Sequence, residues 1–108
     1  RAGRGDRRIL ETEWREESLL IAQRLKAHAE ARGITLLQFA VAWLLANRVV
    51  SSVIAGPKTV EQFGDYFGAV DYAWTDEDEA LVDSLVTPGH ASTPGYHDPQ
   101  YPFHGRRR

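Results

Sequence analysis

The chain has 108 residues, of which 43% are hydrophobic and 26% are charged, and its formal net charge is −2. This length allows at most one domain and falls well below the roughly 250 residues of a complete (β/α)8 barrel. The chain contains no cysteine, which excludes a disulfide framework and a thiolate metal site. We therefore expect a globular protein of a reducing compartment, the cytoplasm.

The distribution of charge and hydropathy argues against membranes and nucleic acids as partners. The longest apolar-rich stretch, Thr35–Ala46, is shorter than the about 20 residues that span a bilayer, and no segment has the order of a signal peptide. Arginines gather at both ends of the chain and flank an acidic body, densest at Asp76–Glu79. Because these ends lack interleaved aromatic residues and border a surface that repels phosphate, we expect them to be solvated ends.

The N-terminal part of the chain predicts a loop followed by a helix. Residues 1–15 are polar, arginine-rich and glycine-punctuated, which is typical of a loop or a disordered lead-in. Apolar residues and one histidine then recur at helical spacing, which predicts a helix over Glu16–Ala31. Gly33 is the natural C-terminal stop of this helix.

A second helix and the only strand follow. Thr35 and Gln38 have the spacing of a capping box, and the run Leu36–Ala46 is apolar nearly all round, so this helix must be covered on most sides. The next run, Val49–Ala55, is short and rich in β-branched residues and predicts a buried strand. Because a single strand has no ladder partner, the sequence implies a sheet that it does not itself contain.

Two further helices are predicted from the same capping chemistry. Thr59 begins one that runs to about Val70, and Thr75 begins another over about Asp76–Val86. Negative charge in the first turn suits the helix dipole, so the acidic run there is expected to need no partner. The C-terminal residues 88–108 are rich in Pro, Gly and His and are expected to form an irregular extension, after a structured segment over 16–87.

The loop between the strand and the third helix is the most informative place for chemistry. The predicted strand ends at Gly56, and the chain then runs through Pro57 and Lys58 into a helix capped at Thr59. The free N–H groups at the start of this helix therefore point to the space beyond the C-terminal end of the strand. Lys58 adds a full positive charge, and in α/β barrels the loops after the last two strands commonly hold a phosphate. The pattern therefore indicates an anion site, although a Gly-Pro turn before a helix is more often only a turn.

The order of elements and the residues together resemble a known family. The string SSVIAGPKTVEQ, preceded by AEARGITLLQFAVAWLLAN and followed by FGDYFGAVDYAWTDEDEALVDSL, is similar to the C-terminal region of the aldo-keto reductases. The resemblance runs from about Glu16 to Val86. It implies an α/β fold, here the mostly helical C-terminal part of a (β/α)8 TIM barrel. It also implies NADP(H) as cofactor and an oxidoreductase that interconverts aldehydes or ketones and alcohols, with a small carbonyl substrate.

The resemblance implies roles for the residues of the loop. Gly56 and Pro57 would run their backbone beside the adenosine phosphates of the cofactor. Lys58 matches the position of a basic residue that pairs with the 2′-phosphate of NADP. Thr59 would contribute its hydroxyl or its N–H near the same group.

Three residues of the following helix are also implied in cofactor binding. Gln62 would lie against the adenine or its ribose, and Asp65 could accept a hydrogen bond from the adenine amine. Tyr66 stands where the family usually has Asn. A phenol can stack on adenine or hydrogen-bond to it, but it does not reproduce the paired donor and acceptor of a carboxamide.

The catalytic residues of the family are not found in this sequence. The family's catalytic set is Asp, Tyr, Lys and His, all supplied by earlier strands of the barrel. In it the tyrosine, its pKa lowered by the lysine, protonates the carbonyl as hydride arrives. No tyrosine or lysine of this chain lies in that motif context. We therefore expect a cofactor-binding segment with no catalytic residue, inactive alone as a reductase. The runner-up interpretation is a non-catalytic truncated or structural/interaction fragment of the same fold.

Other interpretations are weaker. His90, His97 and His104 recur every seven residues, but prolines break the segment, so we expect no metal site. The stretch AHAEARGITLLQFAVAWLL has helix-turn-helix form, but its second helix offers almost no polar side chains to base edges. The apolar helix and the unpaired strand also predict that the isolated chain exposes apolar surface and either self-associates or packs loosely.

Overall fold

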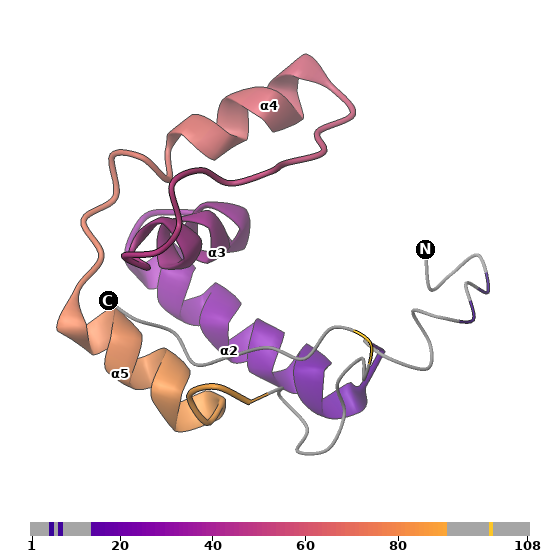
Figure 1. Ribbon diagram of the computed structural model, residues 1–108, viewed down its shortest axis with the longest axis vertical. Helices are drawn as coiled ribbons and strands as arrows, with labels where there is room; N and C mark the ends of the chain where they lie inside the picture. Colours follow the sequence, from indigo (N-terminus) through magenta and orange to yellow (C-terminus); the bar gives the residue numbers. More distant parts are fainter. Residues whose placement is uncertain (1–4, 6, 8–13, 91–99, 101–108) are drawn as a thin grey trace.

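A computed structural model of the protein describes Gly5, Arg7, residues 14–90 and Gln100. Four helices are found in these residues, with bounds α2 (Glu16–Ala31), α3 (Leu36–Leu45), α4 (Val60–Phe67) and α5 (Asp76–Leu85). Helix α3 is the middle element, since α2 and α4 both contact it (Figure 1). Helix α5 lies beside α2, on the side away from α4 (Figure 1). Most of the predicted lead-in and of the predicted C-terminal extension lies outside the described residues.

The first two helices begin and end as local chemistry dictates. Helix α2 spans the predicted residues, and Gly33 follows it with φ of 76°, a left-handed conformation that favours glycine and ends the helix. The capping box of α3 is complete. The Thr35 hydroxyl accepts from the N–H of Gln38 at 3.1 Å, and the Gln38 amide oxygen accepts from the N–H of Thr35 at 3.0 Å. Both predictions are confirmed.

The last two helices are slightly shorter than predicted. Helix α4 ends at Phe67, short of the predicted Val70, and α5 ends at Leu85 with Val86 as its cap. Thr75 and Asp78 form a complete capping box at the start of α5. At α4 only half of the capping box is formed. The Thr59 hydroxyl accepts from the N–H of Gln62, but the Gln62 side chain accepts from the N–H of Lys58 and not from that of Thr59.

The predicted strand Val49–Ala55 is not formed within the described residues. The chain turns after α3 and then runs without regular structure from Ser52 to Pro57 (Figure 1). The physical reason is that a strand needs a neighbour for its backbone groups, and no described segment lies alongside to form a ladder. The described part of the chain is therefore helical, and the α/β expectation is corrected for it.

The core is small and centred on α3. Its buried apolar residues come from α2, from α3 and from the turn after α4: Ala29, Phe39, Val41, Ala42 and Ala69. The Phe39 ring lies 5.5 Å from the His28 ring and 4.8 Å from the Trp74 ring, joining α2 and α3 to the segment before α5. Helix α4 has no buried residue of its own. No helix of the described residues combines the length and the apolar character needed to cross a membrane.

Candidate functional site

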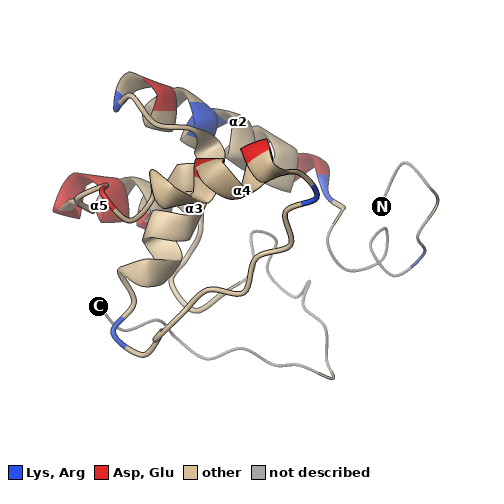
Figure 2. Ribbon diagram, turned by 90° about the horizontal axis from the view of Figure 1, so that it is seen from above, with Lys and Arg blue, Asp and Glu red and all other residues tan. Residues whose placement is uncertain are grey.

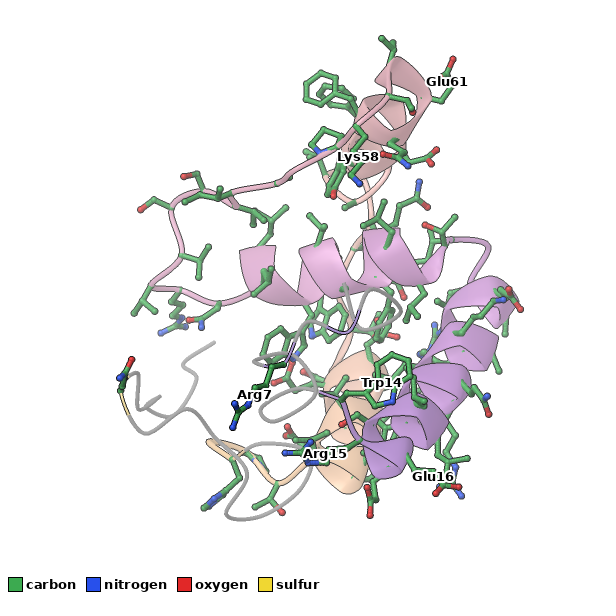
Figure 3. The ribbon with its side chains drawn as sticks, turned by 90° about the vertical axis from the view of Figure 1, so that its right-hand side faces the viewer. Arg7, Trp14, Arg15, Glu16, Lys58 and Glu61 are labelled. Atoms are coloured by element: carbon green, nitrogen blue, oxygen red, sulfur yellow. The ribbon has the colours of Figure 1, made fainter. Side chains whose placement is uncertain are left out.

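The loop Gly56–Thr59 leads into α4 and carries the candidate anion site. Lys58 is exposed and makes no ion pair with any described residue. Figure 3 shows it beside the first turn of α4, where Glu61 lies apart from it. A Cβ built on Gly56 would meet no atom within 4 Å, so space is open above the backbone at this point.

The backbone around this loop is only partly capped. The N–H of Lys58 donates to the Gln62 side chain at 2.8 Å, and the N–H of Gln62 donates to the Thr59 hydroxyl at 3.1 Å. The N–H groups of Val60 and Glu61 find no acceptor among the described residues. An exposed cation beside two free N–H groups at a helix N-terminus fits an anionic group such as a phosphate.

The remaining candidate residues are placed differently from one another. Pro57 is half-buried, and Gln62 and Asp65 are exposed. The carbonyl oxygen of Asp65 accepts from the Gln38 side chain at 3.0 Å, which ties α4 to α3. Tyr66 is partly buried and packs on the cluster formed by Val41, Ala42 and Ala69. The structure therefore gathers the loop and Gln62 at one end of α4 and turns Tyr66 toward the interior.

An apolar groove lies next to the loop. It has a volume of about 350 Å³ and is formed by α3, the extended segment after it, and α4. Its lining residues are Val41, Leu45, Ser51, Ser52, Val53, Ala55, Phe63, Tyr66, Phe67 and Val70. No charged side chain lines the groove. In Figure 2 the ribbon between the turn after α3 and Lys58 is tan, the colour of residues other than Lys, Arg, Asp and Glu.

Sequence reasoning missed a buried carboxylate on the opposite side of the molecule. Asp78 is fully buried, and its carboxylate accepts from His28 Nε2 at 2.6 Å, from the Tyr72 hydroxyl at 2.8 Å and from the N–H of Thr75 at 3.0 Å. The indole of Trp74 donates to the buried Glu79 at 2.8 Å. The expectation that the acidic run needs no partner is therefore wrong.

One signal in the sequence could have found this network. His28 lies on the apolar stripe of α2, and a buried polar side chain must have a hydrogen-bond partner. Around the same contact, Arg32 pairs with Glu77, and this hydrogen bond raises the pKa of the guanidinium. The acidic first turn of α5 meets His28 and Arg32 at the C-terminal end of α2 in this way. In Figure 2 the red ribbon of α5 lies on the same side of the molecule as this end of α2.

The protonation of the network indicates a structural role. Burial, followed by the hydrogen bond to Asp78, raises the pKa of Tyr72 to about 12. Burial alone would raise the pKa of Asp78, but hydrogen bonds from His28, Thr75 and Tyr72 outweigh it and hold this pKa at about 2. A tyrosine that acts as an acid near neutral pH needs a lowered pKa. Tyr72 is therefore not suited to protonate a carbonyl.

The described residues hold no group of three His, Asp or Glu side chains placed to bind a metal ion. His97 and His104, two of the histidines considered from the sequence, lie outside the described residues.

Comparison with protein families gives a match. The model of the Aldo/keto reductase family matches residues 2–87, which include the loop, all four helices and every candidate binding residue. No solved structure matches the chain.

Proposed function

Because the chain belongs to the aldo/keto reductase family, we propose that it supplies the NADP(H)-binding loop of an oxidoreductase that interconverts aldehydes or ketones and alcohols. The family itself indicates an oxidoreductase and implies a (β/α)8 barrel. In this proposal residues 16–87 are the closing, mostly helical part of such a barrel. The nicotinamide cofactor and a small carbonyl compound are then its ligands.

The observation that carries the proposal is the exposed Lys58 beside the free N–H groups of Val60 and Glu61. The 2′-phosphate that distinguishes NADP from NAD carries close to two negative charges at neutral pH. Lys58 would pair with this phosphate, and the two N–H groups would donate to its oxygens. The Thr59 hydroxyl, which accepts from Gln62, keeps its own proton for a further hydrogen bond.

The other candidate residues have smaller parts in the proposal. Gly56 and Pro57 would let the backbone approach the adenosine phosphates, since no side chain occupies the space above Gly56. Gln62 and Asp65, exposed on α4, would contact the adenine or its ribose. Tyr66, whose ring is partly buried against the core cluster, would contact the adenine through the part of the ring that remains exposed.

The proposal places the reaction centre elsewhere than in the described residues. The chemistry supplied by a bound nicotinamide is hydride transfer, and it needs a nearby proton donor. Tyr72, the tyrosine of the buried Asp78 network, has a pKa raised to about 12, and its hydroxyl donates a hydrogen bond to Asp78. The residues at the loop bind and orient; they do not move a proton.

Titration of the chain with NADPH and NADH tests the proposal. Lys58→Ala removes one charge-assisted contact that is partly open to solvent, which we expect to weaken NADPH binding by about 1.5–3 kcal/mol, or roughly ten- to a hundredfold. NADH, which lacks the 2′-phosphate, should be barely affected. The matched control is Lys26→Ala, which removes the exposed lysine of α2 that pairs with Glu30. Equal losses for the two cofactors, or no loss for either, would contradict the role of Lys58.

A further inference from the structure

The N-terminus of α4 differs from those of α3 and α5 in one hydrogen bond. All three helices begin after a threonine whose hydroxyl accepts from the N–H of the residue three positions later. In α3 and α5 the side chain of that later residue accepts in return from the N–H of the threonine. In α4 the Gln62 side chain accepts instead from the N–H of Lys58, at 2.8 Å. The returned bond is therefore made one residue earlier, to the residue that carries the cation of the loop.

The residue types at the helix start do not account for this shift. The starts of α3 and α4 have the same pair at the same spacing, Thr35 with Gln38 and Thr59 with Gln62. In α3 the Gln38 amide oxygen accepts from the N–H of Thr35 at 3.0 Å, which is the ordinary capping box. The shifted bond of α4 is therefore a property of how its loop lies against the first turn of the helix.

The shifted bond holds Lys58 to α4. The Lys58 side chain is exposed and pairs with no carboxylate in the part of the chain that the structure describes. A lysine ammonium sits on a flexible four-carbon stem, so its reach depends on where its backbone is held. The bond from the N–H of Lys58 to Gln62 fixes that point beside the first turn of α4, where Figure 3 shows the side chain.

We propose that Gln62 is a positioning residue for NADP(H): by accepting from the N–H of Lys58, it places the Lys58 ammonium where the 2′-phosphate binds. This inference rests on the proposed function, in which that phosphate binds at Lys58. It gives Gln62 a part in the choice between NADP(H) and NAD(H). The energetic basis is preorganisation, because a lysine whose backbone is already ordered loses less conformational entropy when the phosphate binds.

The positioning role can be separated from a contact between Gln62 and the adenosine. The amide oxygen of Gln62 is engaged with Lys58, whereas its NH2 group has no acceptor among the residues that the structure describes and could donate to an adenine or a ribose. NADPH and NADH share the adenosine, so a contact of this kind would affect both cofactors alike. A role that acts through Lys58 affects the 2′-phosphate, which only NADPH carries.

Titration of the 108-residue chain with NADPH and NADH tests the proposal through Gln62→Ala. Loss of one hydrogen bond that is open to solvent should lower the ratio of NADPH affinity to NADH affinity about three- to tenfold. Gln62 is exposed and alanine is a good helix former, so circular dichroism should show an unchanged helical content. The matched control is Gln23→Ala, at an exposed glutamine of α2, which should leave the ratio unchanged.

Two further measurements show whether Gln62 acts through Lys58. In a chain that already carries Lys58→Ala, the substitution Gln62→Ala should change the ratio much less than in the wild type, because the two residues are coupled. In the free chain, the amide proton signal of Lys58 should move upfield in Gln62→Ala, since its hydrogen bond is lost. It should stay downfield in Gln62→Glu, whose carboxylate also accepts from an N–H.

The outcomes distinguish this inference from the proposed function. If Lys58→Ala lowers the ratio but Gln62→Ala does not, the positioning role is overturned and the phosphate site stands. A Lys58 amide signal that does not respond to Gln62→Ala would also overturn the positioning role. If the chain binds neither cofactor, or if Lys58→Ala leaves the ratio unchanged, the proposed function fails at this loop and the inference fails with it.

Discussion

The two sides of α3 differ in how their polar groups are hydrogen-bonded and in how far their side chains are buried. On the side of α2 and α5, Asp78 is fully buried and accepts hydrogen bonds from His28, Tyr72 and Thr75. On the side of α4, the helix has no buried residue, and the segment Ser51–Gly56 leaves its backbone unpaired among the described residues. Both sides meet on one helix, since α3 contributes Phe39 to the first and Val41 and Ala42 to the second.

The difference separates the part that holds the shape from the part that carries the proposed cofactor-binding loop. A buried carboxylate with several donors fixes the angle between two helices, because any movement leaves a charge without partners. The α4 side instead has an exposed lysine, two free N–H groups and an apolar groove. These features contribute little to the stability of the free chain and would gain contacts when a ligand binds. Perturbing the α2–α5 side should change stability, whereas perturbing the α4 side should mainly change binding.

The largest expected effect is that of Asp78→Asn. The amide keeps the shape of the side chain but removes the negative charge that accepts from His28 and Tyr72. We expect a loss of about 3 kcal/mol in the free energy of unfolding, measured by urea denaturation. The matched control is Asp83→Asn, an exposed residue of the same helix, which should change stability by less than about 0.5 kcal/mol. Equal effects of the two substitutions would mean that the buried network does not hold α2 and α5 together.

The pH dependence of stability should follow the same carboxylate. The pKa of Asp78 is about 2 in the folded chain, below the ordinary value near 3.8, so the folded state favours the ionised form. Its contribution of about 2 kcal/mol is therefore present above about pH 4 and lost as the pH falls toward 2. Thermal unfolding across this range should show the loss in the wild type and a much smaller one in Asp78→Asn. A wild-type midpoint that stays constant between pH 4 and pH 2 would contradict this assignment.

Two glycines provide a smaller, paired test of the contact between α3 and α4. A Cβ on Gly68 would lie 2.3 Å from the amide nitrogen of Gln38, whereas a Cβ on Gly64 would meet no atom within 4 Å. Gly68→Ala must displace the Gln38 side chain, which bonds to the Asp65 carbonyl, and should cost about 1 kcal/mol. Gly64→Ala lies within α4 and should stabilise the chain by about 0.5–1 kcal/mol through helix propensity. If both substitutions raised the free energy of unfolding, α4 would not be held against α3 at Gly68.

Local features of this fold could be predicted from the sequence, and long-range ones could not. The starts of α3 and α5 follow from a threonine and a residue three positions later, because capping needs only neighbours in the chain. The partner of His28 is fifty positions away, so its contact with Asp78 depends on how α2 and α5 pack. The segment Val49–Ala55 has the composition of a strand, but composition cannot supply the second strand that a ladder requires.

The candidate site shows the same division. The exposed position of Lys58 at the start of α4 could be predicted, because a turn followed by a capped helix sets it locally. The orientation of Tyr66 could not, because it depends on which face of α4 lies against α3. The roles of these residues in cofactor binding stay predictions.

The phosphate site at Lys58 is tested most directly by a chemical-shift titration of the chain with two adenosine nucleotides that differ only in the 2′-phosphate, adenosine 2′,5′-bisphosphate and adenosine 5′-monophosphate. The bisphosphate should shift the amide signals of Lys58, Val60 and Glu61 in a saturable way, because its 2′-phosphate is the group that these residues bind. The monophosphate should shift them little, and neither nucleotide should move the signals of α2 or α5. Equal shifts with both nucleotides, or shifts spread over α2 and α5 with none at the start of α4, would show that Lys58 and the start of α4 do not form a 2′-phosphate site.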